Sequence, residues 1–511
     1  MRTSALLLSA VVLLAGCGSD SSKSSSSPAT CTCPGGSCNA DGVCVIDDSD
    51  GGTAPVCDAS AKPVGTSALL ERVQKLGTFK VGETVAFDVP ANTASVTIVE
   101  QAISAPDYVV LASGQTFKVD NTAVPLMVKD PDGNVVYDDN QQIPDDLSSL
   151  LAYYGGASPS TGTFTIPNTT AGLAMVGPSG LPAGPWSMIV SDYAYECTNP
   201  AASPLPSDLS CPTGATDEST YDVTVITKPT EAGAIPATGT LDVAIYFVVA
   251  TAEDSSGTDR ELSAAAAASD PDLGRMATTL RTIFSNAGVT VGSITYKDLP
   301  ESVRAAYATG VNVDEAGACG ELSQLLKLAE AGNTLNIFFV SSFQATGLAE
   351  NQLIVGIDGT IPGPSTIGGT IASGAAVTTH DLRFGSAHCN GDPNLDCGAD
   401  LTAYIIAHEA GHFLGLYHVT ESGGTLFDPL DDSAPCPCST CKAASATDRC
   451  SDAIPPPATN TEHQMTVTEC TASTSCSGGA NLMFWLLDSQ GSLGILTPQQ
   501  QAVIRANPLV Q

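Results

Sequence analysis

The stretch His408-Glu409-Ala410-Gly411-His412-Phe413-Leu414-Gly415-Leu416-Tyr417-His418 contains three of the six histidines of the chain. The mostly apolar residues before it predict a helix, on which residues four apart share one face, so His408 and His412 present their rings side by side. Gly415 can adopt a left-handed conformation at little steric cost, which lets the helix end there and the chain return His418 to the same point. Three neutral imidazoles leave a fourth position open on Zn²⁺, which is the arrangement of catalytic rather than structural sites.

Glu409 follows the first predicted ligand and lies one step round the helix from it. Its carboxylate can reach a water on the metal without taking a coordination position, so Glu409 is the predicted general base. The short pattern HExxH also occurs by chance in helices whose two histidines are solvated or hydrogen-bonded. The added glycine and third histidine at fixed spacing favour the zinc site over that alternative.

The full motif HExxHxxGxxH resembles the signature of the metzincin clan of zinc endopeptidases, which also has a methionine turn downstream. Met483, in Asn481-Leu482-Met483-Phe484-Trp485, follows His418 by 65 residues and is the candidate for that turn. The alternative for Met483 is ordinary core packing in an apolar run. Thr497, Pro498 and Gln500 then predict the capping box of a C-terminal helix, such as typically ends a metzincin domain.

Two positions depart from well-known metzincin families. Val419 stands where four of those families have Glu, Asp, Ser or Pro. Trp485 stands two residues after the turn methionine, where some metzincins place a tyrosine as an extra zinc ligand, and it has no oxygen to offer. The sequence GLYHVTES and the acidic segment 427–432 resemble the pappalysin group most closely.

The resemblance implies a zinc-dependent endopeptidase with Glu409 as general base and a protein or peptide as substrate. A rival interpretation is a non-catalytic surface protein with a structural zinc site and a partner- or glycan-binding β-sandwich. The intact Glu409 argues against it, because a structural site needs no base. A metallohydrolase acting on another substrate is a third alternative, which the methionine-turn candidate disfavours.

Acidic residues dominate the charge of the chain, with 54 Asp and Glu against 19 Lys and Arg and a net charge of −35. Such a surface repels nucleic acid and anionic lipid headgroups, so neither is an expected partner. It also suits bound Ca²⁺, for which Asp428, Asp431 and Asp432 are candidate ligands. Another candidate is the Asp130/Asp132 turn, for which a solvated turn is the simpler interpretation. Most of the acidity is explained by solubility alone.

The N-terminus is expected to be a targeting segment rather than part of the fold. Arg2 precedes the apolar run Ala5 to Ala15, and Leu14-Ala15-Gly16-Cys17 resembles a bacterial lipobox, which implies cleavage before Cys17 and lipidation of this cysteine. A plain secretory signal is the alternative. A serine-rich tether and a small cysteine-rich module follow in residues 18–65. We therefore expect an exported outer-membrane or cell-surface lipoprotein whose contact with the membrane is a lipid anchor, with release from the cell as an alternative.

Sixteen cysteines remain after Cys17, and disulfides are the expected state in an exported chain. The six between the zinc helix and the methionine turn allow fifteen pairings, so none is assigned. A structural zinc on Cys436, Cys438 and Cys441 is a weaker alternative. Cys57 and Cys319 have no obvious local partners. Either they pair with each other, or Cys57 covers the zinc as a thiolate before processing.

Residues 66–230 predict an all-β sandwich, because apolar and polar residues alternate in short segments such as 84–89 and 221–225, separated by turn signals. The pieces VKDPDGNVVYDD and AGPWSMIVSDYAYEC resemble sandwich domains of secreted bacterial peptidases, including the P-domain of proprotein convertases. Two roles stay open for this region: a folding or latency partner of the peptidase, or a binding module.

Residues 228–239 predict a linker, and residues 238–511 a metzincin-like α+β domain with a twisted mixed sheet and a zinc-binding helix. Strands are expected at 241–250, 289–296, 335–340 and 376–379, and helices at 261–287, interrupted near Asp270-Pro271, and at 321–331. An edge strand just upstream of the zinc helix is expected to receive an extended substrate through backbone hydrogen bonds. His380, His388 and His463 lack ligand spacing and are expected to play no part in the zinc site.

Overall fold

The computed structural model of the chain divides into residues 1–16 with 59–511 and a second unit, residues 17–58. It describes the following residues: 11–15, 37–38, 44–45, 72–104, 108–112, 115–119, 121–139, 144, 146–153, 156–158, 160–198, 218–253, 259–314, 317–346, 352–382, 398–421, 426–434, 478–487 and 494–511. In the second unit only the short pair β2 (Ser37–Cys38) and β3 (Cys44–Val45) is described. The following paragraphs concern the larger unit.

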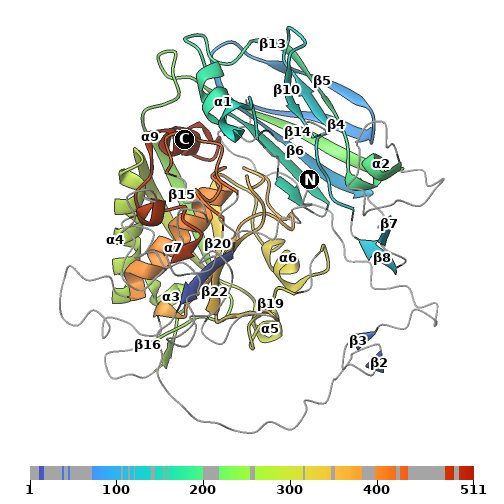
Figure 1. Cartoon of the computed structure of the whole chain (residues 1–511). Helices are drawn as coiled ribbons and strands as arrows, with labels where there is room; N and C mark the ends of the chain where they lie inside the picture. The colour runs from blue at the N-terminus through green and yellow to red at the C-terminus, as the bar shows by residue number, and fades with distance from the viewer. Residues whose placement is uncertain are drawn as a thin grey trace, which may run out of the picture. The chain divides into compact units, whose positions relative to one another are not determined.

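Two antiparallel sheets form a β-sandwich in the first half of the chain (Figure 1). One has the order β11-β12-β6-β14-β4 and the other β10-β9-β13-β5. Their bounds are β4 Val73–Lys80, β5 Thr84–Val89, β6 Thr93–Ser104, β9 Met127–Lys129, β10 Val135–Asp138, β11 Gly156–Ser158, β12 Thr161–Ile166, β13 Gly184–Ile189 and β14 Thr220–Pro229. The hairpin β7 (Tyr108–Ala112) with β8 (Gln115–Val119), the short helices η3 (Leu147–Ser149), α1 (Thr170–Met175) and α2 (Tyr193–Thr198) complete this region.

The sandwich core explains why these residues form strands. On β5 the predicted alternation is confirmed, because Val85, Phe87 and Val89 are buried while the residues between them are exposed. Trp186 of β13 is fully buried, lies 6.4 Å from Phe87 between ring centroids, and donates its indole N–H to the main-chain oxygen of Pro182 at 2.8 Å. Apolar residues from both sheets meet in one cluster, as expected of a sandwich.

A seven-stranded mixed sheet with the order β18-β15-β20-β23-β22-β1-β24 lies in the second half of the larger unit. Its bounds are β1 Val11–Ala15, β15 Gly239–Phe247, β18 Val289–Asp298, β20 Thr334–Val340, β22 Gln352–Asp358, β23 Ala375–Thr378 and β24 Leu486–Leu487. The strands β18, β15, β20 and β23 are parallel, whereas β22 runs antiparallel to β23. The outer edge of β22 pairs with the N-terminal segment β1, again antiparallel.

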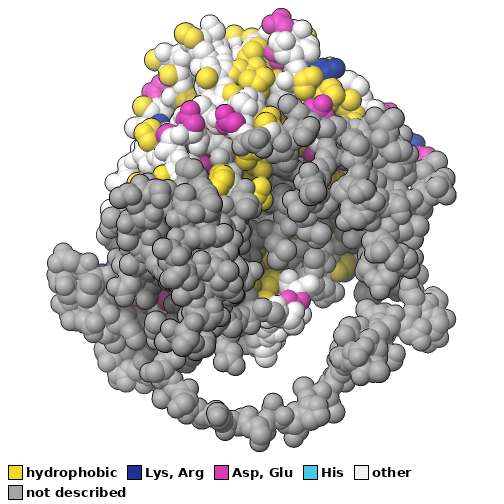
Figure 2. Space-filling view, in the orientation of Figure 1, with side chains coloured by type: hydrophobic (Ala, Val, Ile, Leu, Met, Phe, Trp, Pro, Cys, Tyr) yellow, Lys and Arg dark blue, Asp and Glu magenta, His cyan; other side chains and the backbone are white. Residues whose placement is uncertain are grey.

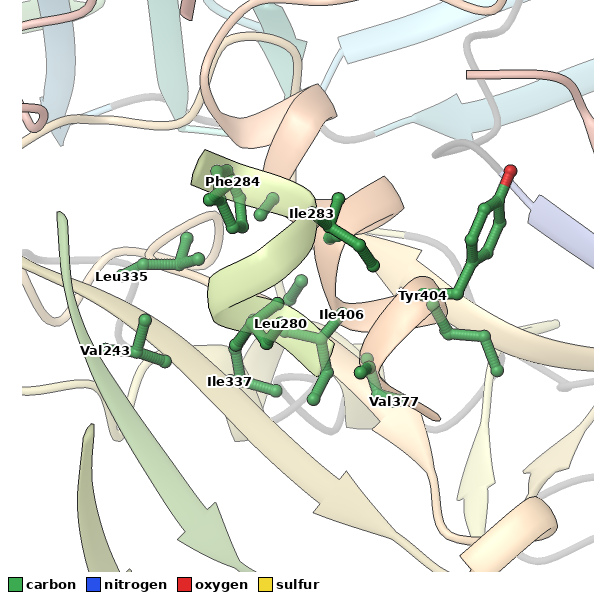
Figure 3. Close-up of a cluster of buried hydrophobic side chains, with 14 of the residues drawn as sticks. Val243, Leu280, Ile283, Phe284, Leu335, Ile337, Val377, Tyr404 and Ile406 are labelled. Atoms are coloured by element: carbon green, nitrogen blue, oxygen red, sulfur yellow. The ribbon is translucent and has the colours of Figure 1, made fainter. Parts of the chain in front are cut away.

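Helices cover both faces of this sheet. On one face, α4 (Pro271–Ser285) and α7 (Gly398–Phe413) lie side by side, and Figure 3 shows Leu280 and Phe284 of α4 and Ile406 of α7 directed at the strands. On the opposite face, Leu325 and Leu326 of α6 (Glu321–Leu326) join a second apolar cluster. The remaining elements are β16 Thr251–Glu253, β17 Asp259–Glu261, α3 Ala264–Ala267, α5 Glu301–Ala306, β19 Val311–Asn312, β21 Phe343–Gln344, η5 Gly478–Ala480 and α9 Pro498–Ala506.

The predicted linker at residues 228–239 is wrong at both ends. β14 runs to Pro229 and β15 begins at Gly239, so only the residues between them connect the two regions. Lys228 is buried. Its ammonium donates to the main-chain oxygens of Arg505 (2.5 Å), Asn507 (3.2 Å) and Val510 at the end of the chain, which offsets the cost of burying it. Burial lowers the pKa of Lys228 to about 7, and the charges of Arg72 and Arg505 add to this.

On the face of the larger unit that Figure 2 draws in colour, acidic side chains are scattered and basic ones are rare, in keeping with the net charge of −35. Within the described residues, no helix is both long and apolar enough to cross a bilayer.

The predicted helix at 321–331 is shorter than expected, since α6 ends at Leu326. The interruption of the helix expected at 261–287 is confirmed, because α4 begins at Pro271 with Asp270 as its N-cap.

Candidate metal centre

The three predicted ligand histidines converge on one point. The Nε2 atoms of His408 and His412 lie 3.0 Å apart, and each lies 3.2 Å from Nε2 of His418. His408 and His412 face the same way from the last turns of α7. Gly415, with φ of +107°, reverses the chain after the helix and brings His418 back. In the described part of the chain, this is the group of His, Cys, Asp or Glu residues with the geometry to hold a metal ion.

The second ring nitrogens show that the group suits a cation. Nδ1 of His408 donates to the main-chain oxygen of Leu482 (2.6 Å) and Nδ1 of His412 to that of Leu416 (2.7 Å). Nδ1 of His418 donates a hydrogen bond to Oε2 of Glu421 at 3.0 Å. Because a neutral imidazole has one N–H, all three Nε2 atoms direct lone pairs at one another. A shared cation makes that arrangement favourable, and tetrahedral Zn²⁺ would set the nitrogens about 3.3 Å apart.

Burial favours the neutral form of two of these rings, those of His408 and His412. His408 and His412 are fully buried. Burial, with a contribution from His418, lowers the pKa of His408 to about 3. Burial and the neighbouring rings likewise hold the pKa of His412 well below its ordinary value. Metal binding therefore needs no proton to be removed from these two rings near neutral pH.

Glu409 is fully buried, and neither of its carboxylate oxygens has a hydrogen-bond partner. The side chain lies against β22 at Gly356, where a Cβ would come within 2.3 Å of Oε1 of Glu409. Burial raises the pKa of Glu409 well above its ordinary value, and the charge of Asp358 adds to this. A buried carboxylate with both oxygens unpaired fits a group whose partner is a reactant rather than another side chain.

Met483 lies against helix α7 between the first two histidines of the group. A Cβ built on Gly411, in the turn of α7 between the first two ligands, would come within 2.5 Å of the Met483 sulfur, so only glycine fits there. The main-chain oxygen of Met483 accepts a hydrogen bond from Val419 N at 3.0 Å, next to the third ligand. The main-chain oxygen of Leu482, one residue earlier, accepts the hydrogen bond from Nδ1 of His408. The segment Asn481–Phe484 thus contacts the surroundings of all three histidines.

A pair of side-chain amides fixes this segment to helix α9. Oδ1 of Asn481 accepts from the main-chain N–H of Met483 at 2.8 Å, so its Nδ2 must face Gln500, to whose Oε1 it donates at 2.8 Å. Gln500 Oε1 also accepts from the main-chain N–H of Thr497 at 3.0 Å, which confirms the predicted capping box. One glutamine therefore caps α9 and supports the turn below the metal centre.

Sequence reasoning did not identify Glu421, which orients the third ligand. The sequence feature that could have identified it is an acidic residue three positions after His418. Burial opposes ionisation of Glu421, but the electrostatic interaction and the hydrogen bond with His418 keep its pKa below the ordinary value. Tyr153 of the sandwich region packs edge-on against Tyr417 of the motif, with ring centroids 5.0 Å apart. The sandwich therefore contacts the motif itself, which no sequence pattern indicated.

The candidate calcium ligands are not brought together. Within the described residues, Asp428, Asp431 and Asp432 do not form a metal-binding group. Asp431 and Asp432 instead accept hydrogen bonds from the side chain (2.5 Å) and main chain (2.9 Å) of Gln499. The Asp130 carboxylate likewise accepts hydrogen bonds from the main-chain N–H groups of Asp132 (3.0 Å) and Asn134 (2.8 Å), as in an ordinary turn.

Several predicted features fall elsewhere. His380 is described and lies outside the metal group, with Nδ1 3.6 Å from Oδ1 of Asp381. Cys319 is disulfide-bonded. The lipidation site and several other predicted cysteine and histidine positions lie outside the described residues: Cys17, Cys57, His388, Cys436, Cys438, Cys441 and His463.

Comparisons with known proteins add little. No family model matches the chain, and no curated protein matches it. Among solved structures, one similar chain is an active-site mutant of a family two carbohydrate esterase from Clostridium thermocellum, at 8% identity and a TM-score of 0.11. The match covers 53% of this chain and 65% of that chain, so it spans less than two thirds of the esterase. A likeness of this size carries no argument about function.

Proposed function

We propose that this protein is an exported zinc-dependent endopeptidase of the metzincin type, tethered to the cell surface through Cys17. The observation that carries the proposal is the convergence of three imidazoles, with Nε2 atoms 3.0–3.2 Å apart, beside the buried carboxylate of Glu409, whose oxygens have no hydrogen-bond partner. The order of parallel strands, antiparallel strand β22, zinc helix, methionine segment and C-terminal helix supports the metzincin type. The residues fit zinc because all three ligand atoms are imidazole nitrogens.

The chain's own residues have separate tasks in this mechanism. His408, His412 and His418 hold the ion, and their Nδ1 acceptors fix the direction of each ring. Bound zinc supplies Lewis-acid activation of the peptide carbonyl and acidifies water at the site. Glu409 takes a proton from the attacking water and returns it to the nitrogen of the leaving amine. The surrounding apolar residues exclude bulk solvent.

The edge of β22 suits an extended peptide. In the structure this edge pairs with β1 in antiparallel register, with Val11 opposite Ile357 and Ala15 opposite Gln352. We propose that the substrate backbone pairs with β22 in the same direction, once the targeting segment that contains β1 has been removed. Gly356 then lies next to both the substrate strand and the Glu409 carboxylate, so cleavage would take place at this point of the edge.

The test is the purified chain without its targeting segment and its Glu409→Ala variant, each assayed on casein with and without a zinc chelator. Glu409→Ala should bind one zinc and show at least about 10²-fold lower hydrolysis, because removal of the general base leaves the ligands intact. Chelation should abolish the activity of the unmodified protein. Chelator-resistant hydrolysis, or full activity of Glu409→Ala, would rule out this mechanism. Zinc binding without hydrolysis in both proteins would favour the non-catalytic interpretation.

A further inference from the structure

The outer face of the five-stranded sheet of the sandwich is polar and yet buried at strand β12. Along this strand, Phe164 and Ile166 belong to the sandwich core, whereas Thr161, Thr163 and Thr165 lie on the opposite face. All three threonines are at most 3% exposed. The outward polar face of a two-sheet sandwich normally contacts water, so this face is covered by residues from outside the sandwich.

The segment between β22 and β23 contacts this threonine face and, at the same time, the end of helix α7. The hydroxyl of Thr163 donates to the main-chain oxygen of Pro362 at 2.6 Å. The next residue, Gly363, donates its N–H to the main-chain oxygen of Phe413, the last residue of α7, at 2.9 Å. A Cβ on Gly363 would overlap the Phe413 ring, so the segment lies directly on the helix. Two consecutive hydrogen bonds therefore connect β12 to the residue that follows His412.

The turn that follows α7 also packs against β12. Gly415 has a φ of +107°, and a Cβ built on it would lie 3.6 Å from Cγ2 of Thr165 and 3.9 Å from Cβ of Pro362. The hydroxyl of Thr165 lies 3.0 Å from that of Thr97 on the neighbouring strand β6, and its methyl group is the part that contacts the turn. The turn that returns His418 to the other two histidines is therefore in van der Waals contact with the sandwich.

A second contact from the sandwich reaches the residue just before the third histidine. The ring of Tyr153 packs edge-on against Tyr417, with ring centroids 5.0 Å apart and an interplanar angle of 71°. Asn168 fixes the main chain of Tyr153, because it accepts from its N–H at 2.9 Å and donates to its oxygen at 2.7 Å. The hydroxyl of Tyr417 donates to the main-chain oxygen of Ile361 at 3.4 Å. Tyr417 is thus held by the sandwich and by the segment that Thr163 binds.

We infer that the sandwich positions the third histidine of the metal group, with Thr163 and Tyr153 as positioning residues. One helix fixes His408 and His412 relative to each other, so the geometry of the site varies mainly with the turn that carries His418. A glycine in that turn leaves its backbone free to adopt several shapes. The contacts from the sandwich reach both ends of the turn and select one of them. The inference concerns metal binding and does not depend on peptidase activity.

Zinc affinity and the visible spectrum of the Co²⁺-substituted protein test this in the full chain without its targeting segment. Thr163→Val removes the hydrogen bond to Pro362 and should weaken zinc binding by about three- to tenfold, the factor that one hydrogen bond corresponds to. It should also shift the Co²⁺ absorption bands. Thr161→Val is the matched control on the same face of β12, because the Thr161 hydroxyl donates to Oε1 of Gln101 within the sandwich, at 2.9 Å. It should lower the free energy of unfolding but leave zinc affinity and the Co²⁺ spectrum unchanged.

Tyr153 gives an independent test. Tyr153→Ala removes the ring that packs on Tyr417 and should weaken zinc binding by about three- to tenfold, as expected for the loss of one aromatic pair. Tyr153→Phe keeps the ring and should restore both the affinity and the Co²⁺ spectrum.

The inference is overturned if Thr163→Val binds zinc and Co²⁺ as the unmodified protein does, whether or not Tyr153→Ala folds. It is also overturned if Thr161→Val changes metal binding as much as Thr163→Val, since the sandwich would then act only through overall stability, or if the unmodified protein binds no metal. Weaker zinc binding by Thr163→Val in a protein that hydrolyses no peptide would support the inference and rule out the proposed peptidase.

Discussion

Single residues around the histidines set the direction of each ring. The Nδ1 acceptors differ in kind: His408 and His412 donate to main-chain oxygens, whereas His418 donates to the carboxylate of Glu421 at 3.0 Å. A carboxylate acceptor makes the opposite ring nitrogen a stronger metal ligand than a carbonyl does. Of the three ligands, His418 therefore depends most on a side chain that mutation can remove.

Glu421→Ala is expected to weaken zinc binding by about 10–100-fold, because His418 loses the acceptor that holds its ring. Glu421→Gln keeps an oxygen acceptor without the charge, so its zinc affinity should lie between that of Glu421→Ala and that of the unmodified protein. Competition with a chromophoric chelator measures both constants. Equal affinity of Glu421→Ala and the unmodified protein would show that the carboxylate does not orient the ligand.

Asp428 should make stability depend on pH. Burial raises its pKa to about 7, from 3.8, so the folded protein keeps a proton that the unfolded chain has lost. The stability that the neutral carboxyl contributes is therefore fully present below about pH 4 and is lost as the pH rises through about 7. Asp428→Asn, neutral at every pH, should remove this dependence and be more stable at pH 8 by at most about 4 kcal/mol.

Urea unfolding of zinc-loaded protein at several pH values between 5 and 8 measures the effect of Asp428. Asp88→Asn, at an exposed position on β5, is the matched control and should keep the pH profile of the unmodified protein. If the free energy of unfolding of Asp428→Asn changed with pH in the same way as that of the unmodified protein, the expectation would be contradicted.

At the level of single residues, the sequence predicted the metal ligands because their spacing lies within one helix and one turn. His408, His412, Gly415 and His418 are close in sequence, so local geometry is enough to place them. Within the described residues, the candidate calcium ligands Asp428, Asp431 and Asp432 do not form a metal-binding group, and neighbouring carboxylates need not point to one place.

Among the elements, helix α9 has the most direct link to the metal centre. Gln500, the capping-box partner of the N-cap Thr497, is fully buried and pairs with Asn481, whose side-chain oxygen accepts from the main-chain N–H of Met483. The sequence predicted the helix start at Thr497 and Pro498, because capping signals are local. It did not predict that the same glutamine would reach the turn below the histidines, since that contact depends on how the helix packs.

Gln500→Met should destabilise the protein by about 2–4 kcal/mol, because a side chain of similar size leaves Asn481 and Thr497 with unpaired buried groups. It should also change the visible spectrum of the Co²⁺-substituted protein, because the turn that holds His408 loses its support. Gln501→Met is the matched control: Gln501 is partly buried and its Nε2 donates only to the Leu496 main-chain oxygen at 2.9 Å. A Co²⁺ spectrum unchanged in Gln500→Met would show that the turn holds without the amide pair.

The strands and helices expected from sequence were found where apolar runs are long. The runs at 241–250 and 335–340 correspond to β15 and β20, and the expected strand at 376–379 to β23. β22 had no counterpart among the strands expected by residue range, and the edge strand expected upstream of the zinc helix was given without bounds. Its antiparallel direction relative to β23 depends on the connection between them, which apolar patterning does not encode.

For the whole molecule, the sandwich and the mixed-sheet region are more closely joined than the sequence indicated. Thr163 of β12 donates to the main-chain oxygen of Pro362 at 2.6 Å, in the segment that leads from β22 to β23. Ser95 of β6 donates to the main-chain oxygen of Ala506, at the end of α9. Together with Lys228, these contacts favour the role of a folding partner for the sandwich. Composition could not show this, because Pro and Gly occur in linkers and in strand ends alike.

The central claim is that His408, His412 and His418 bind one zinc ion together. X-ray absorption at the zinc edge, recorded on the full chain without its targeting segment, tests it most directly. The account predicts one zinc per chain, with three imidazole nitrogens at about 2.0–2.1 Å, and the same spectrum for Glu409→Ala. A sulfur shell at about 2.3 Å, or zinc that stays bound when His412 is replaced by Ala, would contradict it.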